Sequence, residues 1–190
     1  MQVGVDEVGR GCLLGFVAAA AVILPSTYPD EGWMGIKDSK KLSAKKREQM
    51  ATYIKNNALA YGIGTASVQE IDEHNILQAV MLAMHRALDQ VAIPFESIAV
   101  DGTYFNPYRD VPHECIVKGD STILSIAAAS IIAKEFRDNA MRELVHELPD
   151  LAVYDICNNM GYGTPAHIEG IRRHGITDHH RKSFKVKSLS

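Results

Sequence analysis

The sequence predicts an α/β fold that forms one domain over residues 1–190. The 190 residues are enough for one hydrophobic core but fewer than the roughly 200–250 at which chains tend to divide into domains. Hydrophobic residues make up 46% of the chain and charged residues 23%, as is typical of folded globular proteins. In the second half of the chain short apolar runs alternate with longer helical patterns, and this order is typical of an α/β fold.

The first half of the chain predicts three strands and one helix. Residues 3–7 predict a short strand that ends at a glycine turn, and residues 17–24 form a continuous apolar run that stops at a proline. Ser43 is expected to cap a basic helix that extends to about Asn57. Residues 59–67 predict the third strand, and short connections would make the three strands an antiparallel meander.

The second half predicts helices and strands in alternation. Residues 75–91 carry apolar side chains at helical spacing and predict an amphipathic helix. Residues 97–101 and 115–117 predict two short strands, and residues 123–147 predict a long apolar helix capped by Asp120 and the hydroxyl residues after it. Because helices separate these later strands, we expect them to run parallel.

The net charge of −3 hides a segregation of acids and bases along the chain. Residues 37–55 carry seven Lys and Arg against two acids, and residues 161–190 carry six against two, which leaves −12 on the rest. Basic flanks around a cation-binding acidic cluster are expected of a protein that holds a polyanion. Solvated helix faces also carry lysine, so charge by itself leaves both interpretations open.

Several classes of protein and site have no support in the sequence. The apolar runs are shorter than the ~20 residues that cross a bilayer, and the N-terminus lacks the pattern of a secretory signal, so we expect a cytoplasmic protein with no membrane partner. Three widely spaced cysteines predict reduced, half-buried thiols rather than disulfides. The eight histidines lack helical zinc spacing and are expected mainly at the surface or in a groove. Neither a P-loop nor a nucleophile elbow is present.

Three aspartates lie where predicted strands or strand turns end. A sheet would bring Asp6, Asp101 and Asp120 together, and their repulsion would be offset by hard cations such as Mg²⁺. Two such ions can activate water and stabilise the leaving oxygen in phosphodiester hydrolysis. Simpler alternatives exist, because Asp101 precedes Gly102 in a common turn dipeptide and Asp120 can cap the long helix. Glu7 can join Asp6 at one site only if the strand twists or ends there.

Two further features point to a nucleic acid. The turn Gly9-Arg10-Gly11 offers backbone N–H groups and a guanidinium to a phosphate and its sugar, although a tight strand connection would also explain the glycines. Tyr162 stands between two glycines, where its ring contributes little to a core and suits contact with a sugar or base. Asp138, four residues after a lysine, is explained by an exposed i,i+4 ion pair.

The chain resembles the ribonuclease HII family, the type 2 ribonucleases H, in motifs that follow the family's order over nearly its whole length. These motifs are GVDEVGRG at 4–11, DSKKLS at 38–43, NILQA at 75–79, DG at 101–102, KGDS at 118–121, SIAAASIIAK at 125–134, RD at 137–138, GYGT at 161–164 and HRKSF at 180–184. One such motif would be weak evidence, whereas this many in order is strong evidence.

The resemblance implies a ribonuclease H fold with a mixed five-stranded sheet, flanking helices and a small helical C-terminal portion, over about residues 150–190, that binds substrate. It also implies a metal-dependent endoribonuclease, with Mg²⁺ or Mn²⁺ in a two-metal mechanism. The implied substrates are RNA/DNA hybrids and duplex DNA with an embedded ribonucleotide. The implied cut lies 5′ of the ribonucleotide and leaves a 3′-hydroxyl and a 5′-phosphate. We expect a monomer.

The same resemblance implies roles for individual residues. Asp6, Glu7, Asp101 and Asp120 would be the catalytic, metal-binding carboxylates. The residues implied in substrate binding are Gly9, Arg10, Gly11, Lys40, Lys41, Asn75, Tyr162 and Arg181. The glycine turn would read the ribonucleotide, Tyr162 would pack against its sugar, and the Lys40, Lys41 and Arg181 segments would line the nucleic-acid groove. Asn75 also has a simpler explanation as a helix cap.

Two alternatives to this enzyme stay open, a nucleic-acid-binding module of the same fold without catalysis and a DNA-specific nuclease. The four carboxylates favour an enzyme, and the glycine turn with Tyr162 favours RNA because both suit a reader of the 2′-hydroxyl. Many relatives have prolines at the positions of Cys12 and Phe16 and a lysine at the position of Met160. The missing lysine charge beside Tyr162 is expected to weaken substrate binding.

Overall fold

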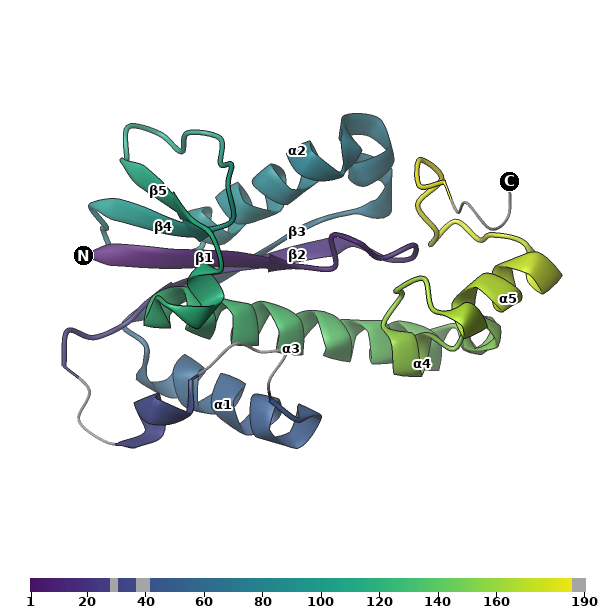
Figure 1. The fold of residues 1–190 in the computed structure, drawn as a ribbon, viewed down its shortest axis with the longest axis horizontal. Helices are drawn as coiled ribbons and strands as arrows, with labels where there is room; N and C mark the ends of the chain where they lie inside the picture. Colours follow the sequence, from purple (N-terminus) through teal and green to yellow (C-terminus); the bar gives the residue numbers. More distant parts are fainter. Residues whose placement is uncertain (28–30, 37–41, 186–190) are drawn as a thin grey trace.

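The computed structural model describes residues 1–27, 31–36 and 42–185, and its centre is a mixed sheet with the strand order β3-β2-β1-β4-β5 (Figure 1). The strands are β1 (Gln2–Val8), β2 (Val17–Ile23), β3 (Ala60–Ala66), β4 (Ser97–Asp101) and β5 (His113–Ile116). The first three pair antiparallel, whereas β1 pairs parallel with β4 and β4 with β5. The predicted meander and the predicted parallel strands are both confirmed.

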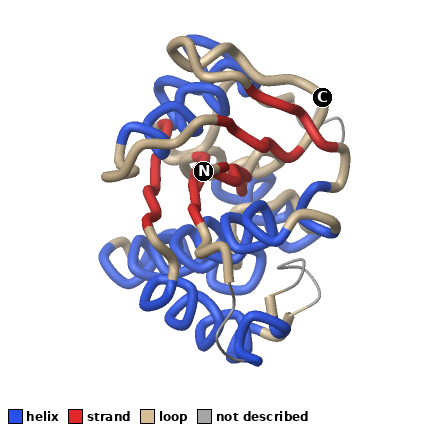
Figure 2. The backbone as a smooth tube through the Cα atoms, turned by 90° about the vertical axis from the view of Figure 1, so that its left-hand side faces the viewer, coloured by secondary structure: helices blue, strands red, loops and turns tan. Residues whose placement is uncertain are grey.

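Helices cover both faces of the sheet (Figures 1 and 2). One face packs against α2 (Val68–Asp89), and the other packs against α3 (Leu124–Glu147), which carries α1 (Ala44–Asn57) on its outer side. The short helices α4 (Ile156–Asn159) and α5 (Pro165–His174) lie near the C-terminal end of α3. Three 3₁₀ turns complete the described elements: η1 (Glu31–Gly35), η3 (Gly119–Ser121) and η4 (Pro149–Tyr154).

Small side chains let the helices approach the sheet closely. All seven residues of β2 are buried, and they face the two helix layers in turn, Ala19 and Ala21 toward α2 and Ala20 and Val22 toward α3. A Cβ atom on Gly4 of β1 would lie 2.3 Å from the backbone of α3, so a larger residue would push that helix away. The distance between β1 and α3 matters because both contribute to the pocket described below.

The structure corrects the predicted start of α2. The helix begins at Val68, where Ser67 and Glu70 form a reciprocal capping box, seven residues before the predicted start. The backbone is non-helical at Asn75, with φ at 69°, and the Asn75 side chain accepts the backbone N–H groups of the two residues that restart the helix. The alternative explanation of Asn75 as a helix cap is therefore confirmed.

The structure also corrects the predicted start of α3. Asp120 lies in η3, and α3 begins four residues later with no side-chain cap at Ile123. The backbone N–H groups of Thr122 and Ile123 bond instead to the carbonyl of Gly119. The interpretation of Asp120 as the cap of the long helix is wrong, because a separate 3₁₀ turn intervenes.

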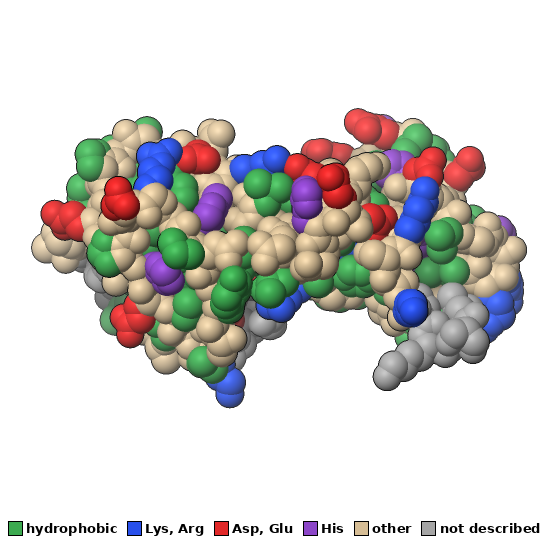
Figure 3. Space-filling model, turned by 90° about the horizontal axis from the view of Figure 1, so that it is seen from above, with side chains coloured by type: hydrophobic (Ala, Val, Ile, Leu, Met, Phe, Trp, Pro, Cys, Tyr) green, Lys and Arg blue, Asp and Glu red, His purple; other side chains and the backbone are tan. Residues whose placement is uncertain are grey.

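Charges that segregate along the sequence are mixed on one face of the molecule. On the face shown in Figure 3, acidic and basic side chains are interspersed among hydrophobic and histidine side chains. No helix among the described residues is both long and apolar enough to cross a membrane. The basic segment at 37–55 is described only from residue 42 onward.

Asp138 differs from its predicted exposed ion pair, because its carboxylate is only 2% exposed. It accepts a hydrogen bond from Lys134 Nζ at 2.8 Å and another from Nη2 of Arg47, on α1, at 3.1 Å. Glu135 lies 3.7 Å from Arg47 Nε. A pair this buried holds α1 to α3, since each charge lacks water and depends on the other.

Removal of the Asp138 charge should therefore destabilise the fold. We expect Asp138→Asn to lower the free energy of unfolding by about 3 kcal/mol, because the buried Arg47 guanidinium loses the nearer of its two carboxylate partners. Denaturant unfolding measures this, with the exposed Glu48→Gln on α1 as the matched control. Equal unfolding free energies for the two variants would contradict a buried ion pair.

Candidate active site

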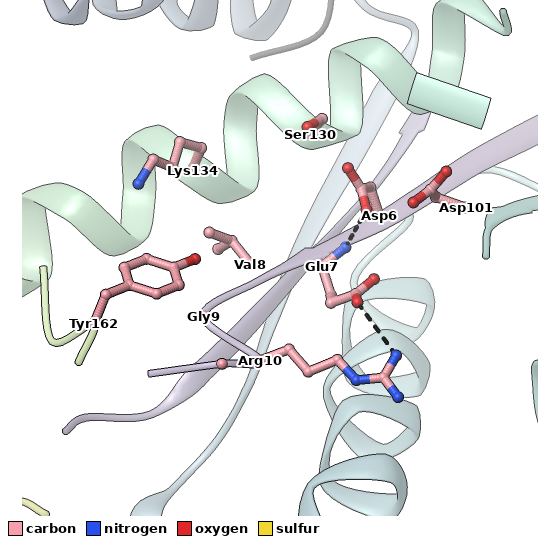
Figure 4. Close-up of a pocket in the computed structure, with 10 residues that line it drawn as sticks. Asp6, Glu7, Val8, Gly9, Arg10, Asp101, Ser130, Lys134 and Tyr162 are labelled. Carbon is pink, nitrogen blue, oxygen red and sulfur yellow. Dashed lines mark hydrogen bonds and ion pairs between the residues drawn. The ribbon is translucent and has the colours of Figure 1, made fainter. Parts of the chain in front are cut away.

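A pocket of about 490 Å³ opens where β1 ends, between the sheet and α3 (Figure 4). Its walls come from the end of β1 and the turn after it, the end of β4, one side of α3 and the loop before α5. The lining residues are Asp6, Glu7, Val8, Gly9, Arg10, Gly11, Asp101, Ser130, Lys134 and Tyr162. Segments that are far apart in the sequence thus meet in one cavity.

Sheet pairing brings the first three predicted carboxylates to this pocket. Val5 pairs with Val100 in the parallel β1–β4 register, so Asp6 and Asp101 leave neighbouring strands at the same level. Glu7 also lines the pocket, although its carboxylate leaves β1 on a different side from that of Asp6 (Figure 4). The strand ends after Val8, as joint participation of Asp6 and Glu7 requires.

The carboxylates repel one another in surroundings that exclude water. Asp6 is 5% exposed, and burial together with the charges of Glu7 and Asp101 raises the pKa of Asp6 well above its usual range. Burial also raises the pKa of Glu7, against the opposing effect of Arg10, whose Nη1 lies 3.9 Å from Glu7 Oε1. A cation in the pocket would stabilise both ionised carboxylates.

Local hydrogen bonds orient two of these groups. The backbone N–H of Glu7 donates to Asp6 Oδ1 at 2.7 Å, and the N–H of Gly119 donates to Asp101 Oδ1 at 2.7 Å. The second bond attaches η3 to the end of β4, next to the pocket. Asp120, in η3, is 7% exposed and lies outside the set of lining residues.

The donor set is compatible with a hard divalent cation, although it is not a finished metal centre. Asp6, Glu7 and Asp101 offer carboxylate oxygens, which Mg²⁺ and Mn²⁺ prefer. Among the described residues, no three acidic, cysteine or histidine side chains converge as a complete metal-binding group. The geometry fits a cation here, because the buried Asp6 carboxylate lines the same pocket as Glu7 and Asp101. Burial first, and then the charges of these two neighbours, raise the pKa of Asp6.

The glycine turn and Tyr162 also line the pocket (Figure 4). Gly9 has φ at 87°, a backbone conformation that favours glycine, and the turn that follows lines the cavity. Tyr162 pairs in an isolated bridge with Cys12, and its side chain keeps 37% exposure at the rim. The ring therefore lines the pocket and is accessible to a ligand there.

Known proteins resemble this chain over nearly its full length. The family model described as Ribonuclease HII matches residues 3–187. The chain is 50% identical over 186 residues to a ribonuclease HII of Parabacteroides distasonis, with 98% of this chain and 90% of the relative covered. The chain belongs to the ribonuclease HII family. It is thus a hydrolase of the type 2 ribonuclease H class, as the sequence motifs predict.

Solved structures agree with the fold. The ribonuclease H2 of Pyrococcus horikoshii OT3 superposes with a TM-score of 0.78 at 22% identity, over 97% of this chain and 93% of that one. The ribonuclease HII in a PCNA complex from Archaeoglobus fulgidus gives 0.75 at 25% identity, over the whole of both chains. The predicted ribonuclease H fold, with its mixed five-stranded sheet, is confirmed.

Sequence reasoning missed two polar residues of the pocket. Ser130 and Lys134 line it from α3, and Asp138 follows at the same four-residue spacing. Lys134 Nζ lies 5.8 Å from the centre of the Tyr162 ring while it donates to Asp138. A stripe of polar residues along an otherwise apolar helix is the signal that would have found them.

Other predicted substrate-binding residues fall in different places. Arg181 is buried, and its guanidinium donates to backbone carbonyls, which differs from the expected position in the groove. Asn75 is exposed at the kink of α2 and is not among the residues that line the pocket. Lys40 and Lys41 lie outside the described residues. Met160, where a lysine was expected, packs its side chain into the C-terminal apolar cluster.

Two of the eight histidines, His167 and His180, are buried and are exceptions to the expectation that the histidines lie mainly at the surface or in a groove. The Thr177 N–H donates to His180 Nδ1 at 3.0 Å, so the neutral His180 ring carries its proton on Nε2. His180 Nε2 lies 3.1 Å from Nε2 of His167, which accepts this hydrogen bond. His167 therefore carries its own proton on Nδ1 and donates it to the Tyr162 carbonyl at 2.9 Å. A chain of hydrogen bonds thus runs from Thr177 to Tyr162.

The stability of the protein should fall as the pH decreases through this histidine pair. Burial, with the charges of His167 and His179, lowers the pKa of His180 to about 4, whereas the unfolded chain takes up the proton near its usual pKa of about 6.5. Because the unfolded state binds the extra proton first, we expect the free energy of unfolding to drop by about 3 kcal/mol between pH 6.5 and 4 from His180.

Denaturant unfolding as a function of pH tests this expectation. His180→Asn should flatten the pH dependence in this range, whereas His146→Asn, at an exposed position of α3, should leave it unchanged. If His180→Asn and the unmodified protein show the same slope, the protons are taken up elsewhere.

Proposed function

We propose that this chain is a metal-dependent endoribonuclease that hydrolyses RNA in RNA/DNA hybrids and incises duplex DNA 5′ of a single ribonucleotide. The observation that supports the proposal is the joint placement, in one pocket, of three repelling carboxylates, the glycine turn and Tyr162. Membership of the ribonuclease HII family supports the same reaction class. The products would be a 3′-hydroxyl and a 5′-phosphate.

In this proposal Asp6, Glu7, Asp101 and Asp120 hold Mg²⁺ or Mn²⁺. When bound, the cations would supply an activated water and stabilisation of the leaving oxygen. Backbone N–H groups fix one oxygen each of Asp6 and Asp101, so that the carboxylates are oriented to bind the cations. Asp120 would complete the set from η3, whose attachment to Asp101 keeps it beside the pocket.

The remaining residues of the pocket would bind and orient the substrate. Backbone groups of the turn at 9–11 would bond to the 2′-hydroxyl, the group that marks a ribonucleotide in DNA. A site built for that hydroxyl penalises its absence, because its polar groups are then left unpaired. Tyr162 would pack against the same sugar, and Lys134, between Asp138 and the ring, would add positive charge near the phosphates.

The C-terminal portion, about residues 150–190, would extend the substrate-binding surface. Lys40 and Lys41 remain predicted groove residues. The cytoplasmic location and the monomeric state likewise stay predictions.

The experiment that tests the proposal compares three matched duplexes, one all DNA, one hybrid and one with a single ribonucleotide, with and without Mg²⁺ or Mn²⁺. We expect cleavage of the last two with metal, and none after chelation. Equal cleavage of all-DNA duplex would indicate a DNA-specific or unselective nuclease. Tight binding without cleavage of any duplex would indicate a binding module.

Asp101→Asn should abolish turnover and leave the fold intact. The change removes a negative charge at nearly constant volume, and the amide oxygen still accepts the Gly119 N–H. Because the charge of Asp101 raises the pKa of Asp6, its loss should also raise the melting temperature of the metal-free protein. Cleavage rates and thermal melting measure the two effects.

The exposed Asp110→Asn is the matched control and should change neither quantity. Near-normal cleavage by Asp101→Asn would remove Asp101 from the reaction. Loss of folding would make its role structural.

Tyr162→Ala should lower the rate of incision at a single ribonucleotide by roughly ten- to a hundredfold, because the sugar is no longer held in place. Tyr162→Phe should retain more activity, since the ring face remains. Metal affinity, measured by titration, should change little. The exposed Tyr104→Ala serves as control, and full activity of Tyr162→Ala would exclude the tyrosine from substrate positioning.

A further inference from the structure

The segment after the glycine turn lies between two other parts of the chain. On one side the N–H of Leu13 donates to the Gly161 carbonyl at 2.8 Å. On the other side the N–H of Gly15 donates to the backbone carbonyl of His179 at 2.9 Å, and the backbone N–H of Arg181 donates to the carbonyl of Leu13 at 2.9 Å. The turn, the Tyr162 loop and the C-terminal segment therefore form one hydrogen-bonded unit.

The Arg181 guanidinium is the centre of this unit. It is 2% exposed, and it donates to the carbonyls of Gly9 at 2.7 Å and Arg10 at 2.9 Å. It also donates to the carbonyls of Gly15 at 2.9 Å and Phe16 at 3.3 Å. A buried guanidinium requires such acceptors, so the carbonyls of the turn are fixed toward Arg181.

Fixing these carbonyls also fixes the N–H groups of the turn. The peptide unit is planar and trans, so the N–H that follows each carbonyl points the opposite way. With the Gly9 and Arg10 carbonyls directed at Arg181, the N–H groups of Arg10 and Gly11 point away from it. These residues line the pocket, so Arg181 determines how the turn presents its donors to a ligand.

Arg137 provides the matching contacts from α3. It is fully buried and donates to the carbonyls of Phe16 at 2.9 Å, Leu14 at 3.1 Å and Met160 at 2.8 Å. A Cβ atom on Gly9 would lie 2.3 Å from Arg137 Nε, so the two are in close contact. Arg137 thus connects the turn to the residue two positions before Tyr162.

The C-terminal segment is connected to Tyr162 and to α2 as well. His180, next to Arg181, reaches the Tyr162 carbonyl through His167. At the other end Asp72 of α2 accepts the N–H groups of Lys182 at 3.0 Å and Ser183 at 2.9 Å. The segment is therefore held on both sides of Arg181.

We propose that Arg181 is a positioning residue for ribonucleotide recognition, which holds the Gly9-Arg10-Gly11 turn in register with Tyr162 so that both act on the same nucleotide. The inference rests on the proposed function and deepens it, because it names the residue that aligns the glycine turn with Tyr162. A direct phosphate contact by Arg181 is excluded by its burial and by its four backbone acceptors.

The first test is Arg181→Lys, which keeps the charge but cannot reach four carbonyls. On the single-ribonucleotide duplex we expect kcat to fall by about ten- to a hundredfold with KM nearly unchanged, because the misplaced turn affects orientation more than affinity. Arg142→Lys, the same change at an exposed position of α3, should alter neither. A wild-type kcat for a folded Arg181→Lys would overturn the proposal.

A second test separates positioning from a phosphate contact and from instability. Arg181→Gln should leave the salt dependence of duplex binding unchanged, whereas loss of a phosphate contact would flatten it by about one counterion. A flattened slope would overturn the positioning role. So would a loss of rate that equals the loss of folded protein measured by melting.

The third test uses Tyr162. If Arg181 acts by aligning the turn with the ring, Arg181→Lys should cost far less in a Tyr162→Ala background than in the wild type, and additive effects would overturn the proposal. If Arg181→Lys does not fold, Asp72→Asn takes its place in the test. Asp72→Asn loosens the C-terminal segment without touching the turn, so it should lower kcat by a smaller factor. An unchanged kcat for Asp72→Asn would then count against it.

These outcomes differ from a failure of the proposed function. An unmodified chain that does not cut the ribonucleotide duplex refutes the function itself. An unmodified chain that cuts it, beside an Arg181→Lys variant that cuts equally well, refutes the positioning role and leaves the function standing.

Discussion

The parallel pairing of β1 with β4 is the constraint on which the site depends. It places Asp6 and Asp101 at the ends of adjacent central strands, where burial and mutual repulsion raise the pKa of Asp6. Such an arrangement costs free energy unless a cation offsets the repulsion, so the rest of the fold must hold these two strands together against it. The helices hold the strands on both faces, and α3 approaches β1 so closely that Gly4 has no room for a Cβ atom.

The second constraint is the glycine turn, which leaves the sheet and so loses the hydrogen bonds of a strand. Backbone carbonyls without partners are costly in the interior. Arg181 and Arg137 supply these partners, and together they donate to the carbonyls of residues 9, 10, 14, 15, 16 and 160. A loop with side-chain partners of this kind can be as well ordered as a strand while its N–H groups remain directed at a ligand.

The sequence predicts the elements better than it predicts the interior charges. The sequence located the first four strands closely, whereas the fifth, predicted at 115–117, lies at His113–Ile116. The cap at Ser43 was predicted correctly because local hydrogen bonding determines it. The first turns of α2 were missed because Asn75 interrupts the helix with a local cap of its own. The motifs led to the family and placed the acidic end of β1, since these residues are contiguous.

Burial of ionisable side chains, by contrast, depends on partners that are distant in the sequence. Asp138 is buried because Arg47, 91 residues away, reaches it from α1, and Arg181 is buried because the carbonyls 165 to 172 residues before it converge on its guanidinium. A basic residue near the C-terminus gives no local sign of such acceptors. Arg181 was expected in the groove but is buried, and the pattern of charges along the sequence could not predict this because it does not show which backbone carbonyls converge on the guanidinium.

The same long-range contacts explain how a C-terminal segment can determine the geometry of a turn at the start of the chain. The Arg181 guanidinium takes its acceptors from the turn, and the Arg181 backbone pairs with the segment after the turn. The neighbouring His180 reaches Tyr162 through His167.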